Sequence, residues 1–119
     1  HKSKKADATI GVAEIEDCTR HGMIRPGPDN RILDMVEKPQ PKDAPSNLGI
    51  IGVYIFSSSI FDAIKKIKPG VNNEYQLTDA IKKLIDTGSH VYYTKIDGKH
   101  IDIGTMNDLK KANIFLSQQ

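Results

Sequence analysis

The chain has 119 residues, with 17 Lys or Arg against 15 Asp or Glu. This length suits one domain with one hydrophobic core, and the nearly balanced, scattered charge argues against a nucleic acid partner. No apolar run reaches the roughly 20 residues that span a bilayer, so we expect no membrane partner. The single cysteine, Cys18, is consistent with a reducing cytoplasmic compartment.

The start of the sequence indicates a piece of a longer protein. Residue 1 is a histidine rather than an initiator methionine, and a charged stretch leads directly into a strand-like run. The stretch does not resemble a signal peptide. We therefore interpret residues 1–119 as a single cytoplasmic domain that lacks its N-terminal part.

The first half of the chain predicts strands. Residues 9–15 and 31–37 are β-prone, and the turn-rich segment 25–30 lies between them, so we expect two strands joined around a hairpin-like connection. Residues 49–56 are almost entirely apolar. That run predicts a central strand covered on both faces in a mixed α/β sheet.

The second half predicts helices with two more strands. Ser59 is the expected N-cap of a first helix, which ends before Pro69-Gly70. A second helix is predicted at about 76–87, with Gly88 as its left-handed C-terminal residue. The apolar residues expected to face inward are Ile60, Phe61, Ile64 and Ile67 in the first helix, and Leu77, Ile81, Leu84 and Ile85 in the second.

Two short strands, 91–96 and 100–103, are expected around the turn at Asp97-Gly98. A last helix begins at Thr105, where Thr105 and Asp108 have the spacing of a capping box. It is expected to bury Leu109, Ala112 and Leu116.

The segment Val36-Glu37-Lys38-Pro39 ends the second predicted strand. A carboxylate can accept hydrogen bonds from two sugar hydroxyls, and an adjacent lysine can bind a phosphate. Ligands of α/β sheets usually bind at strand ends. A solvated Glu-Lys pair explains the same four residues, and on those residues alone it is the better explanation.

Asp102 lies between apolar residues and is followed by Ile103-Gly104. Its carboxylate could be one ligand of Mg²⁺, which typically takes one or two protein carboxylates and fills its shell with phosphate and water. A turn or capping aspartate is an equally good explanation. The four histidines share no spacing typical of metal sites.

Four segments together resemble the sugar-1-phosphate nucleotidylyltransferases, in order and over nearly the whole chain. They are residues 37–39 (EKP), 44–54 (APSNLGIIGVY), 73–81 (NEYQLTDAI) and 102–105 (DIGT). Within that family they look most like the bacterial and archaeal UTP:glucose-1-phosphate uridylyltransferases. Glucose-1-phosphate thymidylyltransferases are the nearest alternative.

The resemblance implies the C-terminal, sugar-phosphate-binding part of a Rossmann-like nucleotidyltransferase fold with a mixed sheet. It implies transfer of a uridylyl group from UTP to glucose-1-phosphate with Mg²⁺, giving UDP-glucose and pyrophosphate. By the same likeness Glu37 holds sugar hydroxyls and Lys38 the sugar's phosphate. Gly22 and Gly52 bring the backbone close to the sugar, although Gly52 could equally be a packing glycine. Asp102 would be the second metal ligand.

Other positions show how far the likeness extends. Glu74, Gln76 and Asp79 match the family pattern in supporting roles, and His21 stands where the family usually has tyrosine. The family's glycine-rich nucleotide loop and its principal metal-binding aspartate have no counterpart in these residues. The resemblance thus implies no catalytic residue here and an inactive isolated chain.

Two further expectations follow. Removing part of a sheet exposes a strand edge, so we expect a homo-oligomer. A non-catalytic binding or assembly module with the same fold is the alternative from another class. Retention of Glu37, Lys38 and Asp102 argues against that alternative.

Overall fold

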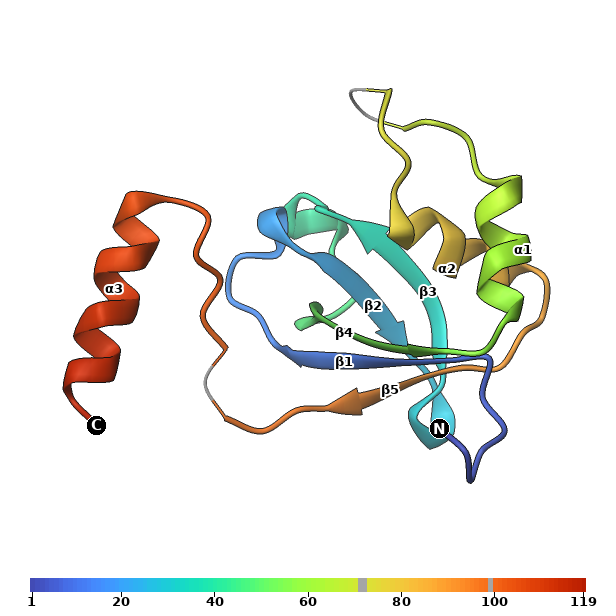
Figure 1. The fold of residues 1–119 in the computed structure, drawn as a ribbon, viewed down its shortest axis with the longest axis horizontal. Coiled ribbons are helices and arrows are strands. Elements are labelled where there is room, and N and C mark those ends of the chain that lie inside the picture. The colour runs from blue at the N-terminus through green and yellow to red at the C-terminus, as the bar shows by residue number, and fades with distance from the viewer. Residues whose placement is uncertain (71–72, 99) are drawn as a thin grey trace.

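The computed structural model describes residues 1–70, 73–98 and 100–119, which form a mixed α/β structure around one curved sheet (Figure 1). The strands are β1 (Ala8–Glu14), β2 (Gly22–Pro26), β3 (Ile32–Glu37), β4 (Leu48–Phe56) and β5 (Val91–Lys95). The α-helices are α1 (Ser59–Lys66), α2 (Leu77–Asp86) and α3 (Met106–Ser117). Short 3₁₀ turns lie at η1 (Cys18–Arg20), η2 (Pro28–Asn30) and η3 (Pro41–Asp43). The α/β class is as predicted.

The sheet has the strand order β3-β2-β4-β1-β5. The β1–β5 pair is parallel, and the β1–β4, β2–β4 and β2–β3 pairs are antiparallel. Arg31, just before β3, forms an antiparallel bridge with Tyr92 of β5. The two ends of the strand order therefore meet, and the sheet curls around a core that includes the fully buried Ile10, Ile24 and Val91.

The expected hairpin between 9–15 and 31–37 is wrong. A further strand, β2, pairs with β3, whereas β1 pairs with β4 and β5. The sequence of β2, Gly-Met-Ile-Arg-Pro, begins with glycine and ends with proline, and both residue types favour turns. The predicted strand at 100–103 is also wrong, because these residues have no ladder partner within the described part of the chain.

The strand β4 is central in the strand order, as predicted, but it is not covered on both faces. Val53 is 50% exposed and Ile55 is 53% exposed. Ile10 of β1 faces Tyr54 and Val12 faces Ile50, so residues 51–53 of β4 lie opposite Gly11 alone. This bulge interrupts the regular alternation of inward and outward side chains.

The three predicted helices are present. On α2 the residues Ala80, Ile81 and Leu84 are buried, and Gly88 follows the helix with φ +81° as predicted. On α1 the buried residues are Ile60 and Ala63, whereas Phe61 is 65% exposed. The expected N-cap at Ser59 is wrong by one residue, because the structure has Ser58 in that position.

The last helix, α3, begins with the predicted capping box between Thr105 and Asp108. It stands apart from the sheet at the C-terminal end of the chain (Figure 1). Ala112 is buried, but Leu109 and Leu116 are exposed, so the predicted burial of these two leucines is wrong. No helix within the described ranges combines the length and apolar character that a membrane crossing requires.

Candidate functional site

The predicted site begins where the first residue of β2 meets the last residue of β3. Gly22 lies directly opposite Glu37 in the antiparallel pair. The Lys38 backbone N–H donates to the His21 carbonyl oxygen at 2.9 Å, which extends the ladder beyond both strands. The structure therefore brings together three of the predicted residues: Gly22, Glu37 and Lys38.

The Glu37 carboxylate packs over Gly22 and under the start of α2. Thr78 Oγ1, in the first turn of α2, donates a hydrogen bond to Glu37 Oε2 at 2.5 Å. A Cβ atom at position 22 would lie 3.1 Å from that same oxygen and 3.3 Å from Ile50 Cδ1. Only glycine leaves the carboxylate this space without a shift of its neighbours.

Lys38 has an unusual backbone conformation, with φ at +45°. A non-glycine residue in this region turns the chain sharply and carries backbone strain, which is a recurrent feature of binding sites. Its side chain is exposed, and within the described residues Lys38 Nζ forms no ion pair. The ammonium group is thus available to an anion.

Tyr54 of β4 also belongs to this region. Burial raises the pKa of the Tyr54 hydroxyl, and the negative charge of Glu37 raises it further. A neutral tyrosine hydroxyl beside a carboxylate can donate or accept a hydrogen bond with a polar ligand. The sequence analysis assigned no role to Tyr54 or Thr78, because nothing local in the sequence relates either residue to Glu37.

Gly52 occupies the bulge of β4 with φ +83°. A Cβ at this position would meet nothing within 4 Å, and the residue is exposed. The alternative of a packing glycine is therefore wrong. The glycine is required by its left-handed backbone conformation, which leaves its peptide groups open to solvent.

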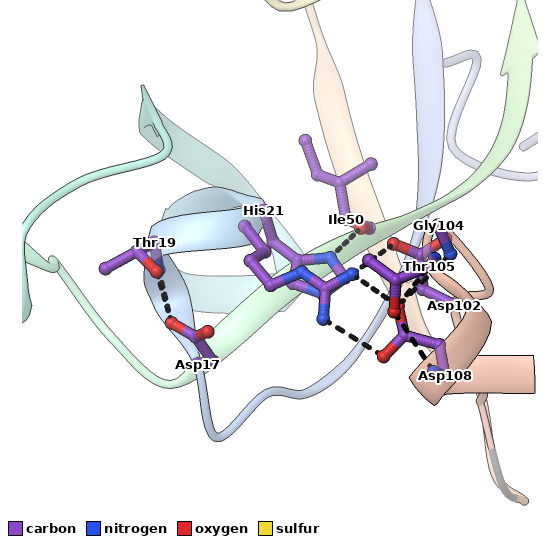
Figure 2. Close-up of polar contacts among 9 residues, drawn as sticks. Asp17, Thr19, His21, Ile50, Asp102, Gly104, Thr105 and Asp108 are labelled. Atoms are coloured by element: carbon purple, nitrogen blue, oxygen red, sulfur yellow. Dashed lines mark hydrogen bonds and ion pairs between the residues drawn. The ribbon is translucent and has the colours of Figure 1, made fainter. Parts of the chain in front are cut away.

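The 3₁₀ turn η1 presents Arg20 toward the start of α3. Asp17 caps this turn by accepting hydrogen bonds from the Thr19 backbone N–H at 3.0 Å and from the Thr19 hydroxyl. Arg20 Nη2 then donates to Asp108 Oδ2 at 3.0 Å. Figure 2 shows Asp108 with Gly104, Thr105 and Asp102 close by. The hydrogen bond from Arg20, followed by that from Thr105, holds the pKa of the Asp108 carboxyl well below its usual range.

Asp102 lies beside this cluster. Arg20 Nη2 is 4.0 Å from Asp102 Oδ2, and the Asp102 side chain is 56% exposed. His100, two residues earlier, contacts the ring of His21 edge-on at 6.3 Å between centroids. These contacts place the segment that contains Asp102 next to Arg20 and His21. Those two residues directly precede Gly22 in the sequence.

The donor set for a metal ion is small. Within residues 1–70, 73–98 and 100–119 no three His, Cys, Asp or Glu side chains are grouped closely enough to hold a metal ion. Asp102 contributes one carboxylate, with the Arg20 guanidinium nearby. Such a site fits Mg²⁺ that takes most of its ligands from phosphate and water, and does not fit a cage made by this chain alone.

A cavity of about 770 Å³ opens between the end of β1, the segment after β5 and α3. Its size is typical of small-molecule pockets. Its lining includes Glu14, Arg20, His21, Lys95 and Asp102, but not Gly22, Glu37, Lys38 or Gly52. The predicted residues thus divide into Asp102 within the cavity and the group around Glu37 outside it, with His21 joining the two.

Comparison with known proteins identifies the family. The model of the family described as Nucleotidyl transferase matches residues 1–119. The UTP--glucose-1-phosphate uridylyltransferase of Mycoplasma genitalium is 40% identical over 115 residues, which are 90% of this chain and 39% of that protein. The Pseudomonas aeruginosa protein of the same name is 45% identical over 85 residues, which are 71% of this chain and 30% of that protein. The chain therefore spans less than half the length of these relatives.

Solved structures agree with this assignment. A UDP-glucose pyrophosphorylase complexed with UDP-glucose superposes with a TM-score of 0.86 at 31% identity, covering 99% of this chain and 47% of that one. A candidate glucose-1-phosphate thymidylyltransferase from Bacillus anthracis, in complex with sucrose, gives a TM-score of 0.76 at 27% identity, covering 96% and 45%. The predicted nucleotidyltransferase fold is confirmed, and the chain belongs to the nucleotidyl transferase family.

Proposed function

We propose that this chain forms the sugar-phosphate-binding part of a nucleotidyltransferase that transfers a uridylyl group from UTP to glucose-1-phosphate, giving UDP-glucose and pyrophosphate. The observation that carries the proposal is the junction of β2 and β3, where the carboxylate of Glu37 adjoins Lys38, a lysine that forms no ion pair with any described residue. The similarity to UTP--glucose-1-phosphate uridylyltransferases supports the choice of substrates.

The residues of the junction, together with Gly52 in the bulge of β4, have separate roles in this proposal. Glu37 accepts hydrogen bonds from neighbouring hydroxyls of the sugar, and Lys38 binds the sugar's phosphate. Gly22 and Gly52 let the sugar approach the backbone. These contacts hold the sugar phosphate so that one of its oxygens attacks the α-phosphorus of UTP in line, and pyrophosphate leaves.

Asp102 is the residue of this chain that would bind Mg²⁺. The ion, when bound, neutralises charge on the crowded phosphate groups. The chain contains no glycine-rich phosphate loop, and in-line transfer depends on positioned phosphates. We therefore propose that the 119 residues alone bind sugar phosphate but do not catalyse turnover.

Binding of glucose-1-phosphate to the 119-residue chain, followed by isothermal titration calorimetry, tests the proposal. Glu37→Ala should weaken this binding by about 1.5–3 kcal/mol, because it removes hydrogen bonds between a charged acceptor and the sugar. Asp86→Ala, which removes an exposed carboxylate from the far end of α2, is the matched control and should bind like the wild type. Equal affinity of Glu37→Ala and wild type would contradict a sugar-binding role.

The nucleotide is tested in the full-length protein that this proposal implies. Pyrophosphate release should be compared for UTP and dTTP, each with the 1-phosphates of glucose, galactose and N-acetylglucosamine. A preference for UTP with glucose-1-phosphate is the expected result. A strong preference for dTTP would favour the thymidylyltransferase alternative. The chain is also similar to a structure of that kind, from Bacillus anthracis. No release with any pair would favour a binding module.

A further inference from the structure

Thr78 contacts the carboxylate that the proposed function assigns to the sugar, although 41 residues separate it from Glu37 in sequence. We propose that Thr78 is a positioning residue, which orients Glu37 so that its free oxygen atoms point to the hydroxyls of a sugar phosphate. This role rests on the proposed function of Glu37.

A glutamate at the exposed end of a strand ordinarily samples several rotamers, and a ligand must then order it at an entropic cost. Here Glu37 is confined from two sides. Thr78 Oγ1 donates to Oε2 from α2, while the backbone of Gly22 lies against the same oxygen from β2. A Cβ at position 22 would also lie 3.4 Å from Thr78 Cγ2, so the strand, the carboxylate and the helix leave little free space around this position.

The helix that carries Thr78 is itself tied to the strand that carries Glu37. Lys82, one turn beyond Thr78 on α2, forms an ion pair with Asp34 of β3 at 3.5 Å between Nζ and Oδ1. Residues four apart lie on the same face of a helix. Thr78 and Lys82 thus bind two positions of β3 at once and fix the distance between α2 and the end of the strand.

In this geometry the two oxygen atoms of the Glu37 carboxylate differ in their hydrogen-bond partners. An ionised carboxylate has about four acceptor positions, and the Thr78 hydroxyl occupies one of those on Oε2. Among the residues that the structure describes, none donates a hydrogen bond to Oε1, which keeps both of its acceptor positions. Thr78 lies in the first turn of α2, and the positive end of a helix dipole favours a negative charge nearby. Glu37 is therefore held as an oriented acceptor before any ligand arrives.

Two substitutions separate the hydroxyl from the shape of Thr78. Thr78→Val keeps the branched side chain and removes the donor, whereas Thr78→Ser keeps the donor. We expect Thr78→Val to weaken glucose-1-phosphate binding by about tenfold, and Thr78→Ser to stay within about twofold of wild type. Circular dichroism and thermal unfolding of each variant check that α2 and the sheet are retained.

A second readout reports the hydrogen bond without any sugar. In protein labelled with ¹³C at the glutamate carboxyl carbons, the Glu37 resonance is assigned by its loss in Glu37→Gln. This resonance should shift in Thr78→Val and stay in place in Thr78→Ser. An unchanged resonance in Thr78→Val would overturn the hydrogen bond itself.

The outcomes distinguish the two proposals. Weaker sugar binding in Thr78→Val, rescued by Thr78→Ser, supports the positioning role. Normal sugar binding in Thr78→Val, with Glu37→Ala still defective, overturns the role of Thr78 and leaves the proposed function standing. Absence of glucose-1-phosphate binding by the wild-type chain overturns the proposed function, and the role of Thr78 with it.

Discussion

At the scale of single residues, two glycines of the site are needed for different physical reasons. Gly22 has side chains packed against it, namely Glu37, Ile50 and Thr78, whereas Gly52 has open space around it and φ at +83°. A methyl group at position 22 thus meets neighbours, and one at position 52 meets only its own backbone. An alanine at position 22 should therefore affect ligand binding, whereas an alanine at position 52 should affect the stability of the fold.

Gly22→Ala should displace the Glu37 carboxylate, because the new Cβ would lie 3.1 Å from Oε2. We expect weaker glucose-1-phosphate binding with little loss of stability. Gly52→Ala should instead lower the free energy of unfolding by about 1–2 kcal/mol through its left-handed conformation. Chemical denaturation and calorimetry of both variants measure the contrast. Equal loss of stability in the two would contradict it.

The charge of Glu37 also affects Tyr54. Burial is the larger cause of the raised pKa of Tyr54, and the Glu37 carboxylate is the smaller one. Glu37→Gln removes only the second cause, so the pKa of Tyr54 should fall while remaining above its ordinary value. Ultraviolet titration measures tyrosine ionisation, and the same titration of Tyr54→Phe identifies which of the four tyrosines responds. A rise of this pKa in Glu37→Gln would contradict the assigned cause.

At the scale of elements, α3 is attached to the rest of the chain through Arg20 and Asp108. Arg20 donates to both oxygens of Asp108, at 3.0 and 3.5 Å, while the backbone N–H groups of Gly104 and Thr105 donate to Oδ2. The Asp108 side chain is only 12% exposed. One carboxylate therefore both caps α3 and binds it to η1.

Acid should release this attachment. The pKa of Asp108 in the folded chain lies below its ordinary value of 3.8, so the carboxylate adds stability that is fully present above that pH. This stability is lost as the pH falls from 3.8 toward the lower folded value. Arg20→Ala should raise the pKa of Asp108 toward 3.8, which a carboxyl ¹³C titration detects.

Lys95→Ala is the control for that experiment. It removes the exposed ion pair with Glu14, and the pKa of Asp108 should not change. If Arg20→Ala also left the pKa of Asp108 unchanged, the guanidinium would not be its main cause. Arg20→Ala should also detach α3, which would appear as faster amide exchange near Asp102. That result would show that the contact between Arg20 and Asp108 also holds the segment of the proposed metal-binding carboxylate in place.

At the scale of the whole molecule, the chain is less compact than its length suggests. Its radius of gyration is 15.2 Å, against about 13.5 Å for a typical domain of this size. The difference reflects α3, which stands apart (Figure 1). Exposed apolar side chains lie on α3, at Met106 and Leu116, and on β4, at Val53 and Ile55.

These surfaces favour self-association of the isolated chain. We expect light scattering after size exclusion to give a mass above the 13.2 kDa of one chain. The double variants Val53→Lys with Ile55→Lys, and Met106→Lys with Leu116→Lys, each place charge on one of these surfaces. The variant that alters the surface through which two chains associate should be monomeric. A mass of 13.2 kDa for the wild type, unchanged on dilution, would contradict the prediction.

Sequence alone predicts what is local in this molecule. The capping box of Thr105 and Asp108 and the left-handed Gly88 depend on neighbouring residues, and both predictions are confirmed. The strand β2 has turn-forming residues at its ends, and its strand character comes from pairing with β3 and β4. The Glu37–Thr78 contact likewise depends on how α2 packs against β3. Burial on α3 was overpredicted because an amphipathic pattern does not say whether a partner is present.

The pairing of β1 has a consequence for the order of events during synthesis. Antiparallel β4 and parallel β5 flank β1, and both are made after it. Strand β1 thus stays without its β5 neighbour until residue 95 has been added, although β4 is complete by residue 56. Such distant pairings slow folding because long loops must close before any contact forms. Nascent chains arrested before β5 should therefore hold β1 with one side unpaired, where a chaperone or a protease can reach it.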